Sequence, residues 1–151
     1  MSCFTTGVTV VTAHTQGQDW GMTCNSFNTV SLDPAMVLWS VRKTSLSHAA
    51  FVNAGGYMVN VLGAQQKDLA LKFSQGSQHE RFTGLSFTRG LNQHPRLNDV
   101  IAWFDCRITQ VVSAGDHDIL IGEVLDFGLH VGHGLAYAQR SFGVLAPLEE
   151  D

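Results

Sequence analysis

The amino-acid sequence predicts a mainly β fold, an antiparallel closed barrel with short helical insertions. Segments rich in Val, Ile, Thr and aromatic residues outnumber helical segments along the chain. The helical segments interrupt the strands without the regular alternation that a parallel sheet requires. At 151 residues the chain has the size of one domain with a substantial hydrophobic core. We therefore expect a single domain over residues 1–151.

The first part of the chain predicts three antiparallel strands and a helix. A strand over 6–14 and a second strand over 20–31 flank a turn-forming stretch, so the two form a hairpin. The Asp-Pro pair at 33–34 ends the second strand, because proline removes a donor from the ladder. A third apolar strand follows over 36–41. The stretch 45–56 opens with serines and closes with two glycines, which predicts a short helix.

The rest of the chain predicts one more helix and three more strands. A strand over 57–63 precedes a short amphipathic helix over 65–73. The stretch 74–85 is polar and predicts a mobile loop. A long hairpin begins at Val100 and turns at 113–117.

Composition indicates a subunit interface and excludes nucleic acid as a partner. Charged residues make up 15% of the chain, against roughly 25% in soluble domains, so we expect a buried contact between subunits. The net charge of −4 leaves no basic stripe that would neutralise phosphates.

The prediction of the cellular compartment rests on the lack of a membrane span and a signal peptide and on the spacing of the cysteines. No apolar run approaches the roughly 20 residues of a membrane span, and the N-terminus lacks the layout of a signal peptide. Cys3, Cys24 and Cys106 are odd in number and far apart, which favours free thiols. We expect a cytoplasmic protein without a membrane partner.

Common catalytic and nucleotide-binding motifs are absent from the sequence. There is no GxGxxG loop, no GxxxxGK[ST], no GxSxG elbow and no HExxH, so a dinucleotide would bind without a Rossmann loop. His130 and His133 have a spacing that some metal sites use, but neighbouring glycines indicate an irregular loop without a third ligand nearby. We expect no metal site.

A polar segment interrupts the otherwise apolar second strand. Two interpretations stay open. Thr23 and Ser26 face solvent on a half-exposed strand, or the segment supplies hydrogen bonds to the polar edge of a flavin ring. The residues of this segment are Thr23, Cys24, Asn25, Ser26 and Phe27.

A second candidate site lies where the third strand ends and the helix begins. Two cations followed by hydroxyls and free helix amides favour a phosphate site, and the alternative is a capped helix with solvated charges. The candidate residues are Ser40, Val41, Arg42, Lys43, Ser45 and Ser47. At the tip of the long hairpin, His117 of the Gly-Asp-His turn is either ordinary turn chemistry or a functional residue.

Five sequence blocks, in this order, resemble the flavin-reductase-like family of FMN-binding split barrels. The blocks are FTTGVTVVT, GMTCNSFNTVSLDPAMVLWSV, SHAAFVNAGGYMVNVL, the GDH turn with ILIGEV, and HGLAYAQRSFG. The resemblance runs from Phe4 to Pro147 and implies a split β-barrel. The stretches HERF, PRLNDVIAWFDCRI and HGLAYAQRSF are most similar to reductase components of two-component aromatic monooxygenases, the 4-hydroxyphenylacetate 3-monooxygenase reductases among them.

The resemblance also implies where the cofactors bind. It implies a homodimer with flavin in a groove near the subunit interface, held by 23–27 and 40–47. Lys72 and Phe73 match a further segment near the cofactor. By the same resemblance, His117 and the segment from Tyr137 to Arg140 lie near the nicotinamide dinucleotide or the exposed flavin face.

The implied activity is that of an NAD(P)H:flavin oxidoreductase. Hydride passes from NADH or NADPH to FMN or FAD, and reduced flavin serves a monooxygenase partner. The sequence does not select between the two flavins or the two donors. The alternatives are a non-catalytic flavin- or haem-binding sensor or carrier and an oxidase of a small substrate. Family members also carry a helix ahead of the first block, and the printed sequence begins where that helix would end.

Overall fold

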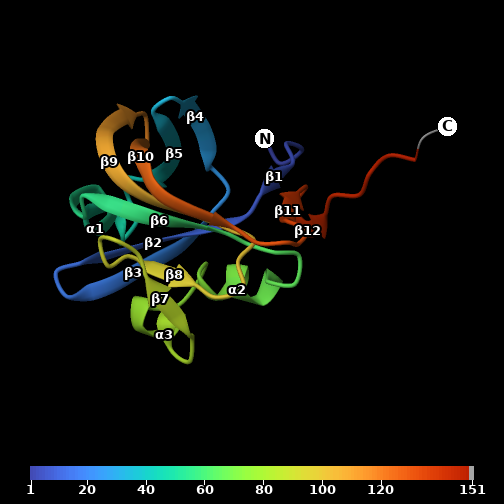
Figure 1. The fold of residues 1–151 in the computed structure, drawn as a ribbon, viewed down its shortest axis with the longest axis horizontal. Coiled ribbons are helices and arrows are strands. Elements are labelled where there is room, and N and C mark those ends of the chain that lie inside the picture. The colour runs from blue at the N-terminus through green and yellow to red at the C-terminus, as the bar shows by residue number, and fades with distance from the viewer. Residues whose placement is uncertain (150–151) are drawn as a thin grey trace.

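The computed structural model describes residues 1–149, and these form a mainly β structure of antiparallel sheets (Figure 1). The strands of the largest sheet are β2 (Thr9–Thr15), β3 (Gln18–Cys24), β4 (Asn28–Leu32), β5 (Ala35–Arg42), β6 (Gly56–Val61), β9 (Ala102–Ala114) and β10 (His117–Leu129). Their spatial order is β3-β2-β6-β9-β10-β5-β4. The strands predicted over 36–41 and 57–63 and the long hairpin from Val100 are thereby confirmed, with small shifts at their ends. The strand predicted over 6–14 is divided at Val8, and its first two residues belong to a different sheet from β2.

The two edges of the seven-stranded sheet meet at Ser26. Strands β3 and β4 are opposite edges, yet only residues 25–27 separate them in the chain. Ser26 Oγ accepts a hydrogen bond from the Ser40 N–H at 3.0 Å, which ties the connection to β5. The sheet therefore curls until its edges lie close together.

The single strand predicted over 20–31 is wrong. The chain leaves β3 after Cys24 and starts β4 at Asn28, where it pairs with β5 instead of β2. At this break the Ser26 hydroxyl contacts the backbone N–H and carbonyl of Ser40 in β5.

The sheet has apolar residues on both faces, which makes β6 buried along its length. Tyr57 and Val59 pack in one cluster with Trp39 and Phe51, while Met58 belongs to a second cluster on the other face. The Trp39 ring meets Phe51 and Tyr57 edge-on, with centroids 4.9 and 5.9 Å apart.

Five short strands make two smaller sheets that the sequence did not predict. They are β1 (Thr6–Gly7), β11 (Leu135–Ala138) and β12 (Ser141–Val144) in one sheet, and β7 (Phe87–Arg89) and β8 (Pro95–Leu97) in the other. With two to four residues each, these strands offer too little alternation for a sequence pattern to reveal.

Three short helices lie between the strands, and the structure describes no helix in residues 1–149 long and apolar enough to cross a membrane. The helices α1 (His48–Asn53) and α2 (Lys67–Lys72) confirm two predicted helices. The mobile loop predicted over 74–85 is wrong, because it contains α3 (Gln78–Phe82). A capping box explains this helix: the Ser77 hydroxyl accepts from the Glu80 N–H, and the Glu80 carboxylate accepts from the Ser77 N–H.

A buried histidine ties the β7–β8 hairpin to β2. His94 is 2% exposed, and its Nδ1 accepts a hydrogen bond from the His14 N–H at 2.9 Å. Arg89 of β7 also pairs with both carboxylate oxygens of Asp19 in β3, at 2.8 and 2.9 Å. These contacts hold the β7–β8 hairpin and the adjacent α3 against the seven-stranded sheet.

Candidate functional site

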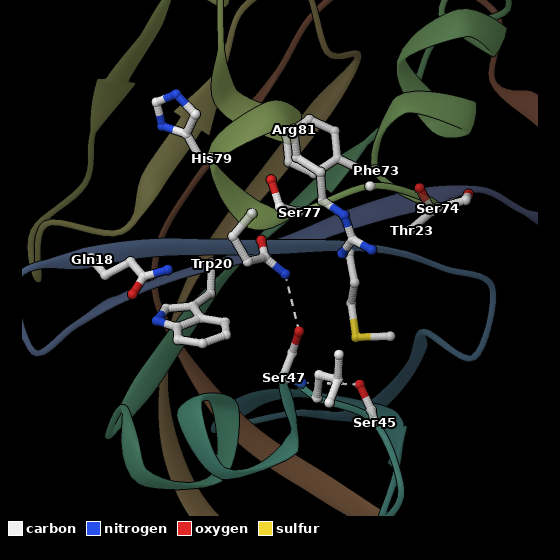
Figure 2. A pocket seen from close by; sticks show the side chains of 14 residues that line it. Gln18, Trp20, Thr23, Ser45, Ser47, Phe73, Ser74, Ser77, His79 and Arg81 are labelled. Carbon is white, nitrogen blue, oxygen red and sulfur yellow. Dashed lines mark hydrogen bonds between the residues drawn. The ribbon is translucent and has the colours of Figure 1, made fainter.

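A groove of about 720 Å³ runs along the free edge of β3. Strand β3 forms its floor, the turn before α1 forms one wall, and the segment from Phe73 to Arg81 forms the other (Figure 2). The lining residues are Gln18, Trp20, Met22, Thr23, Ser45, Leu46, Ser47, Phe73, Ser74, Gly76, Ser77, Gln78, His79 and Arg81.

Helix α3 satisfies the backbone of the β3 edge. The Gly21 N–H donates to Gln78 Oε1 at 2.8 Å, and the Gly21 carbonyl accepts from Arg81 Nη1 at 2.7 Å. Two residues further along β3, the Thr23 N–H donates to the Phe73 carbonyl at 3.1 Å. An edge strand with unpaired groups invites wrong pairing, and here side chains of α3 occupy those groups.

The same glutamine crosses the groove to the opposite wall. Gln78 Nε2 donates to Ser47 Oγ at 3.0 Å, a contact drawn as a dashed line in Figure 2. Ser47 is the N-cap residue of α1, as predicted, but its hydroxyl makes no side-chain cap hydrogen bond. The hydroxyl instead serves the contact across the groove, and the Ser47 N–H donates to Ser45 Oγ at 3.2 Å.

The groove suits an anionic ligand. Arg81 is a cation in the wall, and none of the lining residues within the described chain carries a carboxylate. Burial lowers the pKa of Arg81 from its ordinary value, but an arginine stays protonated at neutral pH. Arg81 Nε also donates to the Gln75 carbonyl at 3.0 Å, so the guanidinium is held in place at two points.

Close packing fixes Phe73 over the middle of β3. A Cβ atom added at Gly21 would lie 2.5 Å from Phe73 Cε1, so only glycine fits beneath the ring. Phe73 is fully buried and meets Phe82 of α3 edge-on at 5.1 Å between centroids. The ring thereby joins α2, α3 and β3 into one rigid wall.

A second hollow of about 240 Å³ lies past Thr23. Thr23 lines both hollows, while Cys24 and Asn25 line only the second, together with Tyr137. The structure therefore brings together the predicted polar segment and the predicted Tyr137, which are more than a hundred positions apart in the chain.

The hydroxyls of Thr23 and Ser26 make hydrogen bonds within the protein, while both residues stay partly exposed. Thr23 Oγ1 donates to the Ala70 carbonyl, and Ser26 Oγ contacts the Ser40 backbone. Cys24 is buried, and this burial raises the pKa of its thiol. Asn25 is exposed, and Phe27 is partly buried and stacks on Phe104 at 5.7 Å.

The predicted cations lie outside the groove. Arg42 pairs in register with His117 across β5 and β10, and Lys43 Nζ donates to Ser113 Oγ at 2.6 Å. Lys72 Nζ donates to the Thr83 carbonyl at 3.1 Å. Arg140 lies in the turn between β11 and β12 with a φ of 63°.

Strand β5 and the hairpin tip bring the remaining predicted residues together. Ser40 and Val41 of β5 are paired with Ile119 and Asp118 of β10. The Lys43 N–H donates to the Asp116 carbonyl at 2.9 Å, so the turn that carries His117 is fixed beside this strand end. His117 Nδ1 lies 2.7 Å from an Asp116 carboxylate oxygen, and this contact lowers the pKa of Asp116.

Sequence reasoning missed three residues that shape the groove: Trp20, Gln78 and Arg81. The S-x-x-E pattern at 77–80 is the signal that would have revealed α3, and with it a helix able to present Gln78 and Arg81. No comparable local signal marks Trp20, because its role depends on the walls that the distant segments supply.

Comparison with protein-family models decides which family this architecture represents. The model described as "Flavin reductase like domain" matches residues 1–146. The chain belongs to the flavin reductase like family. Among curated relatives, this flavin reductase like domain is 44% identical to the reductase component of the flavin-dependent trigonelline monooxygenase of Acinetobacter baylyi, over 92% of the chain and 45% of the relative. It is 41% identical to the FMN reductase (NADH) SmoA of Agrobacterium fabrum, over 95% of the chain and 81% of the relative.

Solved structures agree with this assignment. The domain superposes on the NADH:FAD oxidoreductase SgcE6 of Streptomyces globisporus with a TM-score of 0.92 and 31% identity, over 99% of this chain and 86% of that one. A second structure of the same protein, in complex with NAD and FAD fragments, gives a TM-score of 0.91. The chain spans less than half the length of some curated relatives that it matches, 45% for two of them.

Proposed function

We propose that the protein is an NAD(P)H:flavin oxidoreductase that reduces FMN or FAD in the groove along β3. The observation that carries the proposal is the edge of β3, where hydroxyls and one fixed guanidinium line an open groove without a carboxylate among its lining residues in the described chain. Relatives named flavin reductase or monooxygenase reductase component support it.

The residues of the groove fit a flavin from ring to phosphate. The polar edge of the ring would meet the segment 23–27, where Thr23 lines both the groove and the second hollow and the chain leaves the β2–β3 ladder after Cys24. The hydroxyls of Ser45 and Ser47 face the same groove and suit the phosphate. Phe73 and Thr23 shape the groove between these two ends, and Lys72 stands on the adjacent turn of α2.

The role of the protein in the reaction is to hold the two cofactors and to orient them toward each other. Hydride transfer between nicotinamide and flavin is chemistry that the two cofactors supply when bound. The groove walls hold the flavin through contacts that are already formed, because Gln78 and Arg81 fix α3 to β3 before any ligand arrives. We assign His117 and the segment from Tyr137 to Arg140 to the nicotinamide side or the exposed flavin face, and Tyr137 lines the second hollow.

We also infer a split-barrel architecture and a homodimer. The curl that brings β3 and β4 together at Ser26 supports the barrel. Strands β4 and β10, which lie on either side of β5 in the sheet, expose large apolar side chains, among them Leu32 at 94%, Phe127 at 61% and Leu129 at 72%. Apolar faces of this kind are typical of subunit contacts, and the low charge of the chain agrees with one. Sedimentation that gives a monomer at all concentrations would contradict the dimer.

We propose a flavin-dependent monooxygenase as partner and the cytoplasm as location. Three relatives are named reductase components or subunits of such monooxygenases or demethylases. A partner of this kind receives reduced flavin by diffusion, which agrees with an open groove. The free thiols Cys3, Cys24 and Cys106 agree with a reducing compartment.

Anaerobic mixing of the protein with NADH or NADPH and a hundredfold excess of flavin tests the proposed activity. A reductase bleaches the flavin absorbance over many turnovers. A flavin- or haem-binding carrier or sensor stops at one equivalent or less, and that outcome would overturn the proposal.

A further inference from the structure

A pair of partly buried side chains joins the start of α1 to strand β10. His48 Nε2 donates a hydrogen bond to Asp118 Oδ2 at 2.6 Å, and the two side chains are 23% and 13% exposed. Partial burial shields such a pair from solvent screening, so it holds its two residues together more firmly than a pair on the open surface. The two residues are 70 positions apart in the chain, so the pair fixes two distant segments to each other.

Each of these two segments carries a part of the proposed site. His48 directly follows Ser47, whose turn forms one wall of the groove. Asp118 directly follows His117, which the proposed function assigns to the nicotinamide side. In the described chain, His48 and Asp118 themselves stand outside the groove and the second hollow. They therefore act on a bound ligand only through their neighbours.

The tip of the β9–β10 hairpin depends on this pair more than the turn before α1 does. The turn has further contacts, because the Ser47 N–H donates to Ser45 Oγ and the Ser47 hydroxyl accepts from Gln78. The tip is exposed over 113–116 and is held to the turn by the Lys43 N–H, which donates to the Asp116 carbonyl. The His48–Asp118 pair adds a second anchor on the other side of His117.

Strand geometry directs the pair and the ring of His117 to opposite faces of β10. Successive side chains of a strand point to opposite faces. Asp118 shares a face with Leu120, which packs in one cluster with Phe51 of α1. His117 therefore faces away from α1, and the position of its ring follows from the backbone that Asp118 anchors.

We propose that His48 and Asp118 are a positioning pair, which holds the hairpin tip so that His117 presents its ring to the nicotinamide. The inference rests on the proposed function, because it takes the nicotinamide as the donor. A shift of about 1 Å at a group that aligns the reactants costs up to about a hundredfold in rate. Loss of the pair should therefore slow hydride transfer while the groove still binds flavin.

The kinetic test uses His48→Ala and Asp118→Asn, with His48→Gln as the conservative variant, because its amide can still donate to the carboxylate. Glu123→Gln is the matched control, since it weakens the ion pair with Arg107 elsewhere on the same hairpin. We expect the first two variants to slow hydride transfer and to raise the Michaelis constant for the reduced nicotinamide, each about threefold to tenfold. The FMN dissociation constant should stay nearly unchanged. His48→Gln should regain most of the loss, and Glu123→Gln should match the parent.

A double-variant comparison shows whether the pair acts through His117. If it does, Asp118→Asn adds no further loss to His117→Ala. Losses that multiply in the double variant would overturn the proposal. A loss of FMN affinity as large as the loss in the rate of hydride transfer would overturn it as well, because the pair would then support the groove wall or the fold.

Amide hydrogen exchange of the ligand-free protein keeps this test apart from the test of the proposed function. His48→Ala should raise the exchange of 115–118, and Glu123→Gln should leave it as in the parent. Unchanged exchange in His48→Ala, with a parent that reduces flavin, would overturn the positioning pair alone. Absence of flavin reduction by the parent would overturn the proposed function and with it the role assigned to the pair.

Discussion

Gln78 and Ser47 are hydrogen-bonded across the groove, with 3.0 Å between Nε2 and Oγ. The same amide accepts from the Gly21 N–H through its oxygen. One side chain therefore connects α3, the edge of β3 and the turn before α1. The polar stretch that contains it is a wall of the ligand groove rather than a loop.

Substitutions at Gln78 separate its two roles. Gln78→Glu keeps an oxygen that accepts from Gly21 but places a negative charge beside Ser47, so we expect flavin affinity to fall about tenfold or more through repulsion of the phosphate. Gln78→Ala loses both hydrogen bonds and should destabilise the fold by about 1–2 kcal/mol. Urea unfolding and flavin titration of both variants measure the two effects. An unchanged flavin affinity in Gln78→Glu would mean that the phosphate lies away from Ser47.

Replacement of Gly21 by alanine tests the packing of Phe73. The new Cβ would lie 2.5 Å from Phe73 Cε1 and 3.1 Å from Phe82 Cζ, so the ring has to move and the Phe73–Thr23 backbone contact weakens. We expect a loss of about 1–3 kcal/mol in stability, partly restored by Phe73→Leu. Gly143→Ala is the matched control, because no atom lies within 4 Å of its added Cβ. Equal melting temperatures for both glycine variants would show that Phe73 can move away from β3 at little cost in stability.

The buried His94 predicts a loss of stability in mild acid. Burial, with a smaller contribution from the nearby His14, lowers the pKa of His94 to about 4 in the folded protein. The unfolded chain takes up this proton near pH 6.5 and the folded protein does not, so the stability present above pH 6.5 falls by about 3 kcal/mol between pH 6.5 and pH 4.

Urea unfolding from pH 7.5 to pH 4 measures this dependence. His94→Asn keeps an acceptor for the His14 N–H but does not titrate, so its free energy of unfolding should lack the part of the acidic decline that His94 causes. The difference between the profiles of parent and variant measures that part. Parallel profiles of parent and variant would assign the decline to carboxylates instead.

His117 is predicted to position the nicotinamide rather than to donate an obligatory proton. It stands on the turn between β9 and β10, opposite Arg42. His117→Ala should raise the Michaelis constant for the nicotinamide and slow hydride transfer, with flavin affinity nearly intact. Stopped-flow reduction across pH 5.5 to 8.5 checks this role, since an obligatory proton donor gives a rate that falls as the pH rises in the parent and not in the variant. Nicotinamide kinetics equal to those of the parent would make His117 an ordinary turn residue.

Local patterns were enough to predict the longer elements. Strand β5 follows from its apolar run after a proline, and α1 from its serines and closing glycines. The break between β3 and β4 was missed because the two segments pair with different strands, β2 and β5, and this pairing is set by the folded chain. Short strands such as β1 carry too few residues for any pattern.

The candidate site was predicted in part for the same reason. Thr23 and Ser47 were found from local polar patterns and Phe73 from the resemblance to known reductases, and the structure gathers them in one groove. Gln78 and Arg81 escaped because they act on Gly21, 57 and 60 positions away. A polar helix of five residues looks like a loop unless its capping box is noticed.

A crystal structure of the protein with bound FMN would show directly whether the groove along β3 is the flavin site. We expect the flavin ring against 23–27 at the end of β3 and the phosphate within hydrogen-bond distance of Ser45 or Ser47. Flavin in another hollow, such as the one that Arg96 and His130 line, would contradict the assignment of the groove.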